Sequence, residues 1–365
     1  MSIVSCYVGL DYHDETIRVC VLAEDGELMV NRNVGNDPAE VRRLVQLRGA
    51  SVRGVAIEAC CGSADFAAEL IAQTGWSVKL AHPAAVQRLK KNRDKTDHGD
   101  AWLLADLLRV NYLPEVWLAD SHTRQLRRLV RHRQGLVAER KNIKLRIRSL
   151  LREERMPRCS AANAWTKPWM AWIVTLPLGP ESQWVLNQEL QRLAQVEEAI
   201  RQVDQRFADA TQGDPLVEKL LALPGVALVT AVILRAMIGR FDRFRNGKQL
   251  SRFCGLTPCN ASSGKRQADA GLVNEGNELL RAAMIQLAKR LPRHDARWKE
   301  LHSRLRSTKP ANVATAALAN RWLRGVYYQI VPPQLGQPEQ NSDLGSGSAN
   351  GGEPVAPRPH VVLGL

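Results

Sequence analysis

The sequence lacks any apolar run long enough to cross a membrane. A spanning helix needs about 20 consecutive apolar residues, and no stretch of this chain approaches that length. The first residues, Met1-Ser2-Ile3-Val4, also lack the charged segment and the cleavage site of a signal peptide. These two absences predict a cytoplasmic protein that does not insert into membranes.

Cysteine is scarce and follows no repeating pattern. The chain has 7 cysteines, at positions 6, 20, 60, 61, 159, 254 and 259. Cys60 and Cys61 are adjacent rather than separated by two residues, so the spacing of a zinc knuckle is missing. Reduced, mostly buried thiols are therefore expected.

Acidic residues are too few to balance the basic ones. Over 365 residues, 51 lysines and arginines stand against 37 aspartates and glutamates, which gives a net charge of +14. Such a surplus favours a polyanionic partner, namely DNA, RNA or an acidic membrane surface. The length predicts two or three domains with sizeable cores.

The first third of the chain alternates predicted strands and helices. Apolar and β-branched content predicts strands at 4–10, 16–22, 27–32, 53–57, 77–81 and 115–118. Helices are predicted at 37–49, 63–73 and 97–110. The Asp25-Gly26 turn favours an antiparallel meander of the first three strands, and the alternation that follows favours parallel strands. This order is the one expected of a ribonuclease-H-like sheet.

From about residue 120 the pattern becomes helical. A basic helix at 121–158 and a second at about 181–209 are expected to pack together, with Trp165 to Trp172 capping this hairpin or an interface. Residues 331–365 are rich in Gly, Ser, Pro, Asn and Gln and are expected to be disordered. The predicted domains are 1–119 (ribonuclease-H-like), 120–212 (basic coiled coil), 213–330 (helical) and the tail 331–365.

The basic helix is a candidate nucleic-acid surface. Its candidate contact residues are Arg124, Arg127, Arg128, Arg131, Arg140, Lys141, Lys144 and Arg148. A solvated helix face is the plain alternative, but the one-sided charge excess favours a surface that follows phosphates. The turn Leu223-Pro224-Gly225-Val226 resembles the hairpin of helix-hairpin-helix DNA binders, although Pro-Gly is more often only a turn.

Four carboxylates are candidates for a two-metal site. Asp11 and Glu58 end predicted strands, and Asp97 and Asp100, three residues apart, open a predicted helix and share one of its faces. Each alone has an ordinary explanation as a strand end, a surface charge or a helix cap. Together they suit two divalent ions about 4 Å apart that clamp a phosphate. We therefore expect these carboxylates to bind Mg²⁺, or Mn²⁺ in its place.

A second candidate catalytic segment is the polar loop from Gly255 to Arg266. It contains Ser262 and Ser263, and a serine hydroxyl is a weak nucleophile until it is activated. Attack on a phosphodiester also needs cations that neutralise the phosphate. The basic residues expected to do so are Lys265, Arg266 and, on the helix that starts after Gly276-Asn277, Arg281. No Gly-x-Ser-x-Gly elbow surrounds Ser263, so an esterase-type triad is not supported.

Several motifs resemble those of the DEDD-type insertion-sequence transposases, the family of the pilin-gene-inverting recombinase and the bridge-RNA-guided recombinases. The amino-terminal motifs are Tyr7–Asp11, Ile57–Ala59 and Lys95–Ala101. The carboxy-terminal motifs are Leu223–Val226, Arg243-Phe244, Gly255–Pro258, Ser263-Gly264 and Gly276–Arg281. They follow the family's order and cover nearly the whole chain except the tail. At one position the sequence departs from the family's pattern: it has Val226-Ala227 where Ile-Gly is common.

The resemblance implies a Holliday-junction-resolvase-like domain, a coiled-coil insertion and a transposase domain with a catalytic serine. It implies that Asp11, Glu58, Asp97 and Asp100 bind Mg²⁺ at the scissile phosphate, and that Ser263 forms a phosphoserine link to DNA, with Ser262 as a competitor. The reaction implied is strand exchange between donor and target DNA in a bacterial, nucleoid-associated setting. The partners implied are further copies of the chain, from dimer to tetramer, and a structured non-coding guide RNA used by some relatives.

Other functions stay open from the residues alone. A structure-selective, metal-dependent nuclease would need only the acidic cluster. An actin-like or sugar-kinase-type ATPase would explain Gly9-Leu10-Asp11 followed by Thr16, but a second glycine-rich phosphate loop and an adenosine motif are missing. A non-catalytic nucleic-acid-binding protein or a decayed transposase is the remaining alternative. All the expected acidic and serine positions are filled, which argues against decay.

Overall fold

The computed structural model describes residues 5–47, 49–90, 97–160, 162–260, 269–273 and 276–331. The chain forms two compact units, one of Met1–Ser121 with Arg240–Leu365 and one of His122–Gly239. The domain boundaries expected from the sequence, at 119, 212 and 330, stay predictions. The predicted disordered tail lies, apart from Val331, outside the described residues.

A mixed β-sheet forms the amino-terminal part of the first unit. Its order is β3-β2-β1-β4-β5-β6 in the described part of the chain. The strands are β1 (Ser5–Tyr12), β2 (Thr16–Ala23), β3 (Leu28–Gly35), β4 (Ser51–Glu58), β5 (Val78–Ala81) and β6 (Glu115–Val116). The first three are antiparallel, β4 and β5 run parallel to β1, and β6 is antiparallel to β5. This confirms the predicted ribonuclease-H-like sheet.

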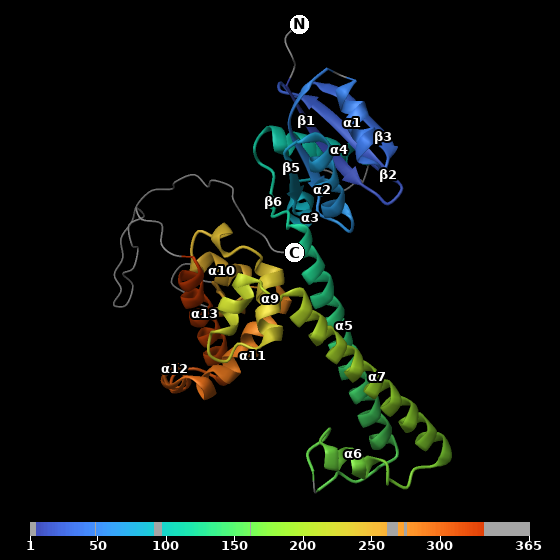
Figure 1. Cartoon of the computed structure of the whole chain (residues 1–365), viewed down its shortest axis with the longest axis vertical. Helices are drawn as coiled ribbons and strands as arrows, with labels where there is room; N and C mark the ends of the chain where they lie inside the picture. Colours follow the sequence, from blue (N-terminus) through green and yellow to red (C-terminus); the bar gives the residue numbers. More distant parts are fainter. Residues whose placement is uncertain are drawn as a thin grey trace. The chain divides into compact units, whose positions relative to one another are not determined.

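Both faces of this sheet are covered by helices (Figure 1). On one face, α1 (Pro38–Gln46) and α2 (Ser63–Thr74) pack on buried side chains such as Val8 and Leu10. On the other, α3 (Pro83–Leu89) and α4 (Asp97–Arg109) cover the residues that alternate with these. The sequence patterns missed α3, a short helix whose start is capped by the His82 side chain and Pro83.

The predicted helical hairpin is confirmed in the second unit. It consists of α5 (Ser121–Glu153) and α7 (Pro180–Ala210), with α6 (Lys167–Ile173) packed at one end (Figure 1). Trp169 of α6 is buried in the core shared by α5 and α7, so the tryptophan-rich segment caps the hairpin. Ion pairs between Arg133 and Asp204, at 2.6 Å, and between Arg146 and Glu189, at 2.8 Å, join the two long helices.

Two shorter helices complete this unit beyond the predicted end of the coiled coil at 212. They are α8 (Pro215–Leu221) and α9 (Leu228–Ile238), and α9 packs on α7. Gly225 adopts φ +77° in the predicted turn between them. Arg235 of α9 donates to Asp214 at 2.7 Å and to Thr123 at 2.8 Å. The second bond joins residues near the beginning and near the end of this unit.

The carboxy-terminal part of the first unit is mostly helical. Its elements are η1 (Phe241–Arg243), α10 (Gly247–Phe253), β7 (Pro258–Asn260), β8 (Asp269–Leu272), α11 (Glu278–His294), α12 (Ala296–Arg306) and α13 (Ala311–Ile330). Between α10 and α11, β7 and β8 pair as a two-stranded antiparallel sheet, and the chain segment that joins them contains the candidate serines.

All seven cysteines are free thiols. Cys6, Cys20 and Cys254 are buried, but Cys60 and Cys61 are exposed, so the expectation of mostly buried thiols was wrong. Among the residues that the structure describes, no helix is both long and apolar enough to span a membrane.

Candidate active site and basic surfaces

Asp11 and Glu58 lie at the carboxyl ends of neighbouring parallel strands. The register of β1 and β4 pairs Leu10 with Ile57, so Asp11 and Glu58 are the next residues of the two strands. Leu10 and Ile57 are fully buried in the core beneath α1 and α2. Because side chains alternate along a strand, both carboxylates belong to the opposite face, which α4 covers.

A glycine lets α4 rest directly on β1. A Cβ atom on Gly9 would lie 2.0 Å from the carbonyl oxygen of Ala101 and 2.6 Å from the amide nitrogen of Ala105. Gly9 precedes Asp11 by two residues and therefore shares its face of the sheet. Asp97 and Asp100 stand in the first turn of the same helix. The close contact thus brings the acidic start of α4 to the sheet face that carries Asp11 and Glu58.

Asp11 and Glu58 also share one electrostatic environment. Burial raises the pKa of the Cys60 thiol, and the negative charges of Glu58 and Asp11 raise it further, against hydrogen bonds with Ser63 that lower it. Both carboxylates therefore act on the same side chain. His13 lies 3.3 Å from Asp11, between Nε2 and Oδ2.

Polar contacts fix the strands beside Asp11 to the start of α4. Arg18 lies opposite Asp11 in the register of β1 and β2. Its Nε donates to the Asn31 side chain at 2.6 Å, and Asn31 in turn donates to the His98 carbonyl at 3.0 Å. Neither Arg18 nor Asn31 was identified from the sequence, because their role depends on strand pairing.

Asp100 is engaged by a residue that the sequence patterns also missed. Lys90, directly after α3, contacts its carboxylate at 2.6 Å, and the two side chains are only 12% and 17% exposed. The side chain of Asp97 lies outside the described residues. Among those described, no three His, Cys, Asp or Glu side chains are close enough to share a metal ion. The donor set is nevertheless made of carboxylate oxygens, the ligands that Mg²⁺ and Mn²⁺ prefer.

Ser262, Ser263, Lys265 and Arg266 lie outside the described residues, but the base of their loop is well defined. A Cβ on Gly276 would lie 2.2 Å from the Cα of Gly255, so two backbone segments cross in contact. Arg281 donates to the Val273 carbonyl at 2.6 Å, and its guanidinium lies against Gly255. Arg281 therefore supports the backbone crossing of Gly255 and Gly276, and its expected contact with a phosphate stays a prediction.

The candidate basic residues of α5 differ in their exposure. Arg128, Arg131, Lys141 and Arg148 are exposed, and Arg124, Arg127, Arg140 and Lys144 are half-buried. Three of them make contacts within the unit as follows. Arg127 donates to the Ala236 carbonyl at 2.9 Å. Lys144 pairs with Glu197 at 3.4 Å, and both Lys144 and Arg148 lie over the Trp165 ring.

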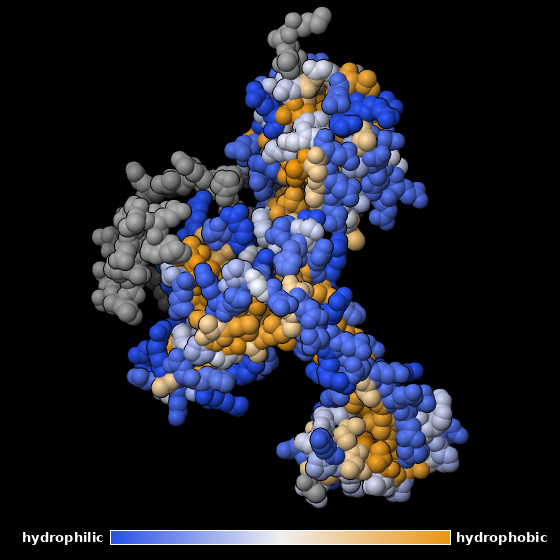
Figure 2. Space-filling model, viewed as in Figure 1, coloured by the Kyte–Doolittle hydropathy of each residue, from blue (hydrophilic) through white to orange (hydrophobic). Residues whose placement is uncertain are grey.

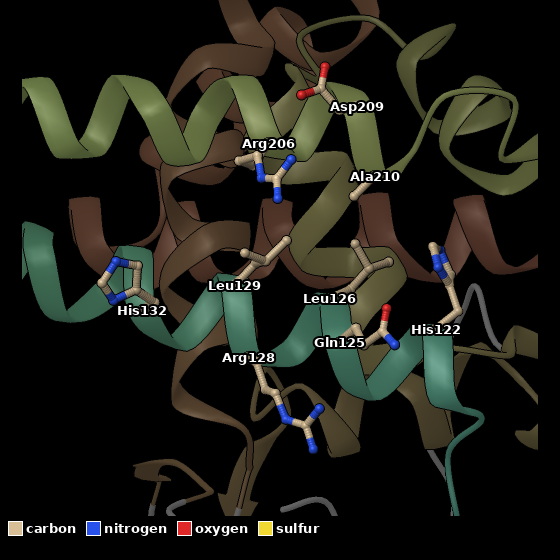
Figure 3. A pocket seen from close by; sticks show the side chains of 9 residues that line it. All are labelled: His122, Gln125, Leu126, Arg128, Leu129, His132, Arg206, Asp209 and Ala210. Carbon is tan, nitrogen blue, oxygen red and sulfur yellow. The ribbon is translucent and has the colours of Figure 1, made fainter.

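A cavity of about 600 Å³ lies between α5 and α7 near the start of α5. Leu126, Leu129 and Arg206 project between the two helices, whereas Arg128 points away from α7 (Figure 3). His122 and His132 also line it, and Asp209 is the single acidic residue among the described lining residues. The cavity thus places Arg206 of α7 beside the cationic side chains of α5.

The sheet, its two converging carboxylates and the basic helical hairpin define the class of nucleic-acid enzymes with a ribonuclease-H-like catalytic domain. Residues 8–156 match a transposase family with the DEDD motif of IS110 elements, and residues 217–303 match the transposase IS116/IS110/IS902 family. The chain belongs to the IS110/IS1111 family of transposases. It is a DNA strand-transfer enzyme with an amino-terminal DEDD domain and a mostly helical carboxy-terminal transposase domain.

Curated relatives are similar over most of their length. The transposase for insertion sequence element IS1111A of Coxiella burnetii is 26% identical over 320 residues, which cover 86% of each chain. The transposase for insertion sequence element IS1328 of Yersinia enterocolitica is 28% identical over 284 residues, or 74% of this chain and 81% of the relative. A probable family 20 transposase of Pseudomonas aeruginosa is 27% identical over 274 residues, or 73% and 80%. This family membership displaces the ATPase alternative.

Proposed function

We propose that this transposase cuts and rejoins the donor and target DNA of an insertion sequence through a covalent link between Ser263 and a DNA phosphate. The observation that carries the proposal is the placement of Asp11 and Glu58 side by side under the acidic start of α4. The serine loop supports it, because β7 and β8 anchor both ends of the loop on a compact helical domain.

The acidic site is proposed to hold Mg²⁺, or Mn²⁺ in its place, with Asp11, Glu58, Asp97 and Asp100 as the ligands. When bound, the ion would supply positive charge beside the scissile phosphate and its oxygens. Lys90 contacts Oδ1 of Asp100 at 2.6 Å and would therefore compete with the ion for this carboxylate.

Ser263 is the proposed nucleophile, with Ser262 as the competitor. Its Oγ forms a bond to phosphorus while the bond from phosphorus to one DNA oxygen breaks. The serine loses its proton, and the leaving DNA oxygen gains one. Attack by a hydroxyl of a second strand then reforms a phosphodiester and returns the serine. The phosphodiester energy is thus kept for rejoining, as strand exchange requires. Lys265 and Arg266 follow the serine and would neutralise the phosphate.

The basic hairpin is proposed to bind nucleic acid, including a structured non-coding guide RNA. The exposed Arg128, Arg131 and Lys141 of α5 support this role, because rows of exposed cations follow a phosphate backbone. The protein is proposed to act in the bacterial cytoplasm, associated with the nucleoid.

Assembly into a dimer or tetramer is proposed, so that the acids of one subunit meet the serine of another. The end of the hairpin that carries α6 supports self-association, since apolar residues are exposed there (Figure 2). Among the large exposed apolar residues of this end are Leu145, Val174, Trp184 and Val185. Apolar patches of this kind mark protein interfaces.

The test is a denaturing gel that detects a covalent protein–DNA adduct on the element's flanking DNA. The wild-type chain is expected to form the adduct in Mg²⁺ and to lose it in EDTA or on Asp11→Asn. Ser263→Ala is expected to abolish the adduct while nucleic-acid binding stays near normal, and Ser262→Ala serves as the matched control. Adducts recovered in Ser263→Ala would move the role to Ser262 or reject covalent chemistry. Cleavage that persists in EDTA would reject metal dependence.

A further inference from the structure

A large pocket opens in the carboxy-terminal domain, apart from the acidic site. Its volume is about 1260 Å³. It lies among α10, α11, α13 and the two strands β7 and β8. These strands are joined by residues 261–268, the segment that contains Ser262 and Ser263. The pocket therefore borders the same small sheet that carries the proposed nucleophile.

The walls of this carboxy-terminal pocket are apolar. Leu256 and Leu272 come from the region of β7 and β8, Ile285 from α11, and Ala316 and Ala317 from α13. A bare phosphate backbone gains nothing from such walls, since its charged oxygens stay in water. The flat, apolar face of a nucleobase does gain from them, because stacking on apolar and aromatic side chains removes it from water.

The pocket carries only positive charge. Its basic residues are Lys248, Arg252, Lys289, Lys309, Arg321 and Arg324, and the described lining residues include no aspartate or glutamate. Cations of this kind beside apolar walls match a ligand that has both apolar faces and phosphates. An unpaired nucleotide strand has both within reach, whereas a duplex keeps its base faces stacked inside.

Ser251 supplies a specific polar group inside this apolar setting. It lines the pocket from α10, is only 1% exposed, and its Oγ has no hydrogen-bond partner among the described residues. An unsatisfied buried hydroxyl costs free energy unless a ligand or water completes its hydrogen bond. A base edge carries the donors and acceptors that would complete it.

We infer that the carboxy-terminal pocket holds one or more bases of an unpaired DNA strand beside the serine loop, with the flanking phosphates on Arg321 and its basic neighbours. The inference rests on the proposed function in taking DNA as the substrate. Strand exchange requires bases to leave one duplex before they enter another, and the pocket would bind them while they are unpaired. A single strand of RNA shares the chemistry, so the experiment includes it as a separate arm.

The binding experiment measures the affinity of the full chain for fluorescent DNA of one sequence, once as a single strand and once as a duplex. EDTA is present so that no cleavage occurs. Ala316→Trp fills the pocket and is expected to weaken single-strand binding by about tenfold while duplex binding stays unchanged. Ala296→Trp, on an exposed residue of α12 away from the pocket, is the matched control and should bind as the wild type. Arg321→Gln should reduce the salt dependence of single-strand binding by about one charge, and Arg304→Gln on α12 should not.

Photocrosslinking of the wild-type chain provides a measurement that does not depend on any variant folding. A single strand that carries 5-iodouracil at successive positions is expected to crosslink to peptides that line the pocket, within 248–258, 271–289 or 309–324. Crosslinks confined to other peptides, or single-strand binding unchanged in Ala316→Trp, would overturn the inference. A strong preference of the pocket for the RNA strand would overturn its assignment to DNA. The adduct assay is independent: a wild-type chain that forms no adduct refutes the proposed function, whereas the binding and crosslinking results judge only the pocket.

Discussion

Replacing Gly9 with alanine should separate the two halves of the proposed acidic site. The added Cβ would lie 2.0 Å from the Ala101 carbonyl oxygen, whereas ordinary contacts begin at 3.4 Å. The difference means that α4 must withdraw from β1 by about 1.4 Å, because the obstructing atoms are backbone and cannot rotate away. Overpacking of this kind costs about 3 kcal/mol, or roughly 10 °C in melting temperature for a domain of this size.

The same displacement should also damage catalysis. A shift of about 1 Å in catalytic groups commonly costs about 100-fold in rate, and α4 carries Asp97 and Asp100. Thermal unfolding and Mg²⁺-dependent strand cleavage would be measured on Gly9→Ala, with Gly135→Ala as the control. Gly135 lies in α5 with open space around its Cβ position, so its substitution should stabilise slightly or change nothing. Gly9→Ala with normal melting and normal cleavage would refute the proposed close contact.

Two further predictions concern charged groups. Lys90→Met should free Asp100 for a metal ion and lower the Mg²⁺ concentration for half-maximal cleavage by about three- to tenfold, whereas Lys79→Met, which breaks a more exposed ion pair, should not. Burial opposes ionisation of Asp214, but hydrogen bonds from Arg235 and backbone amides outweigh it and lower its pKa below the ordinary 3.8. The stability that this carboxylate contributes is therefore complete above pH 3.8 and is lost as the pH falls through the lower folded-state pKa. Asp214→Asn should remove this loss of melting temperature at acidic pH. An unchanged dependence of the melting temperature on pH would contradict the assignment.

Much of the fold follows from local patterns in the sequence. The Asp25-Gly26 turn predicts the β2–β3 hairpin, and in the structure Gly26 has φ +95° while Asp25 accepts a hydrogen bond from the Glu27 amide. The apolar stripes of the long helices predict the hairpin of α5 and α7. These features depend on residues close in sequence, so periodicity and turn chemistry suffice to find them.

The contacts of the candidate site depend on residues far apart in the chain. Nothing local to Lys90 marks it as the partner of Asp100, because the helix before it is short and has weak periodicity. Arg281 lies against Gly255 and bonds the Val273 carbonyl, two contacts that its position in the sequence does not predict. A sequence gives the charge of a side chain but not the direction in which the fold turns it.

The most direct test of the central claim is to map the metal ion with iron in place of magnesium. Fe²⁺ bound in the site generates hydroxyl radicals that cut nearby backbone, and the fragments are identified by mass spectrometry. The account predicts cuts near Asp11, near Glu58 and near 97–100, all suppressed by excess Mg²⁺ and absent in Asp11→Asn. Cuts at unrelated positions, or at only one of these three segments, would contradict a metal site shared by β1, β4 and α4.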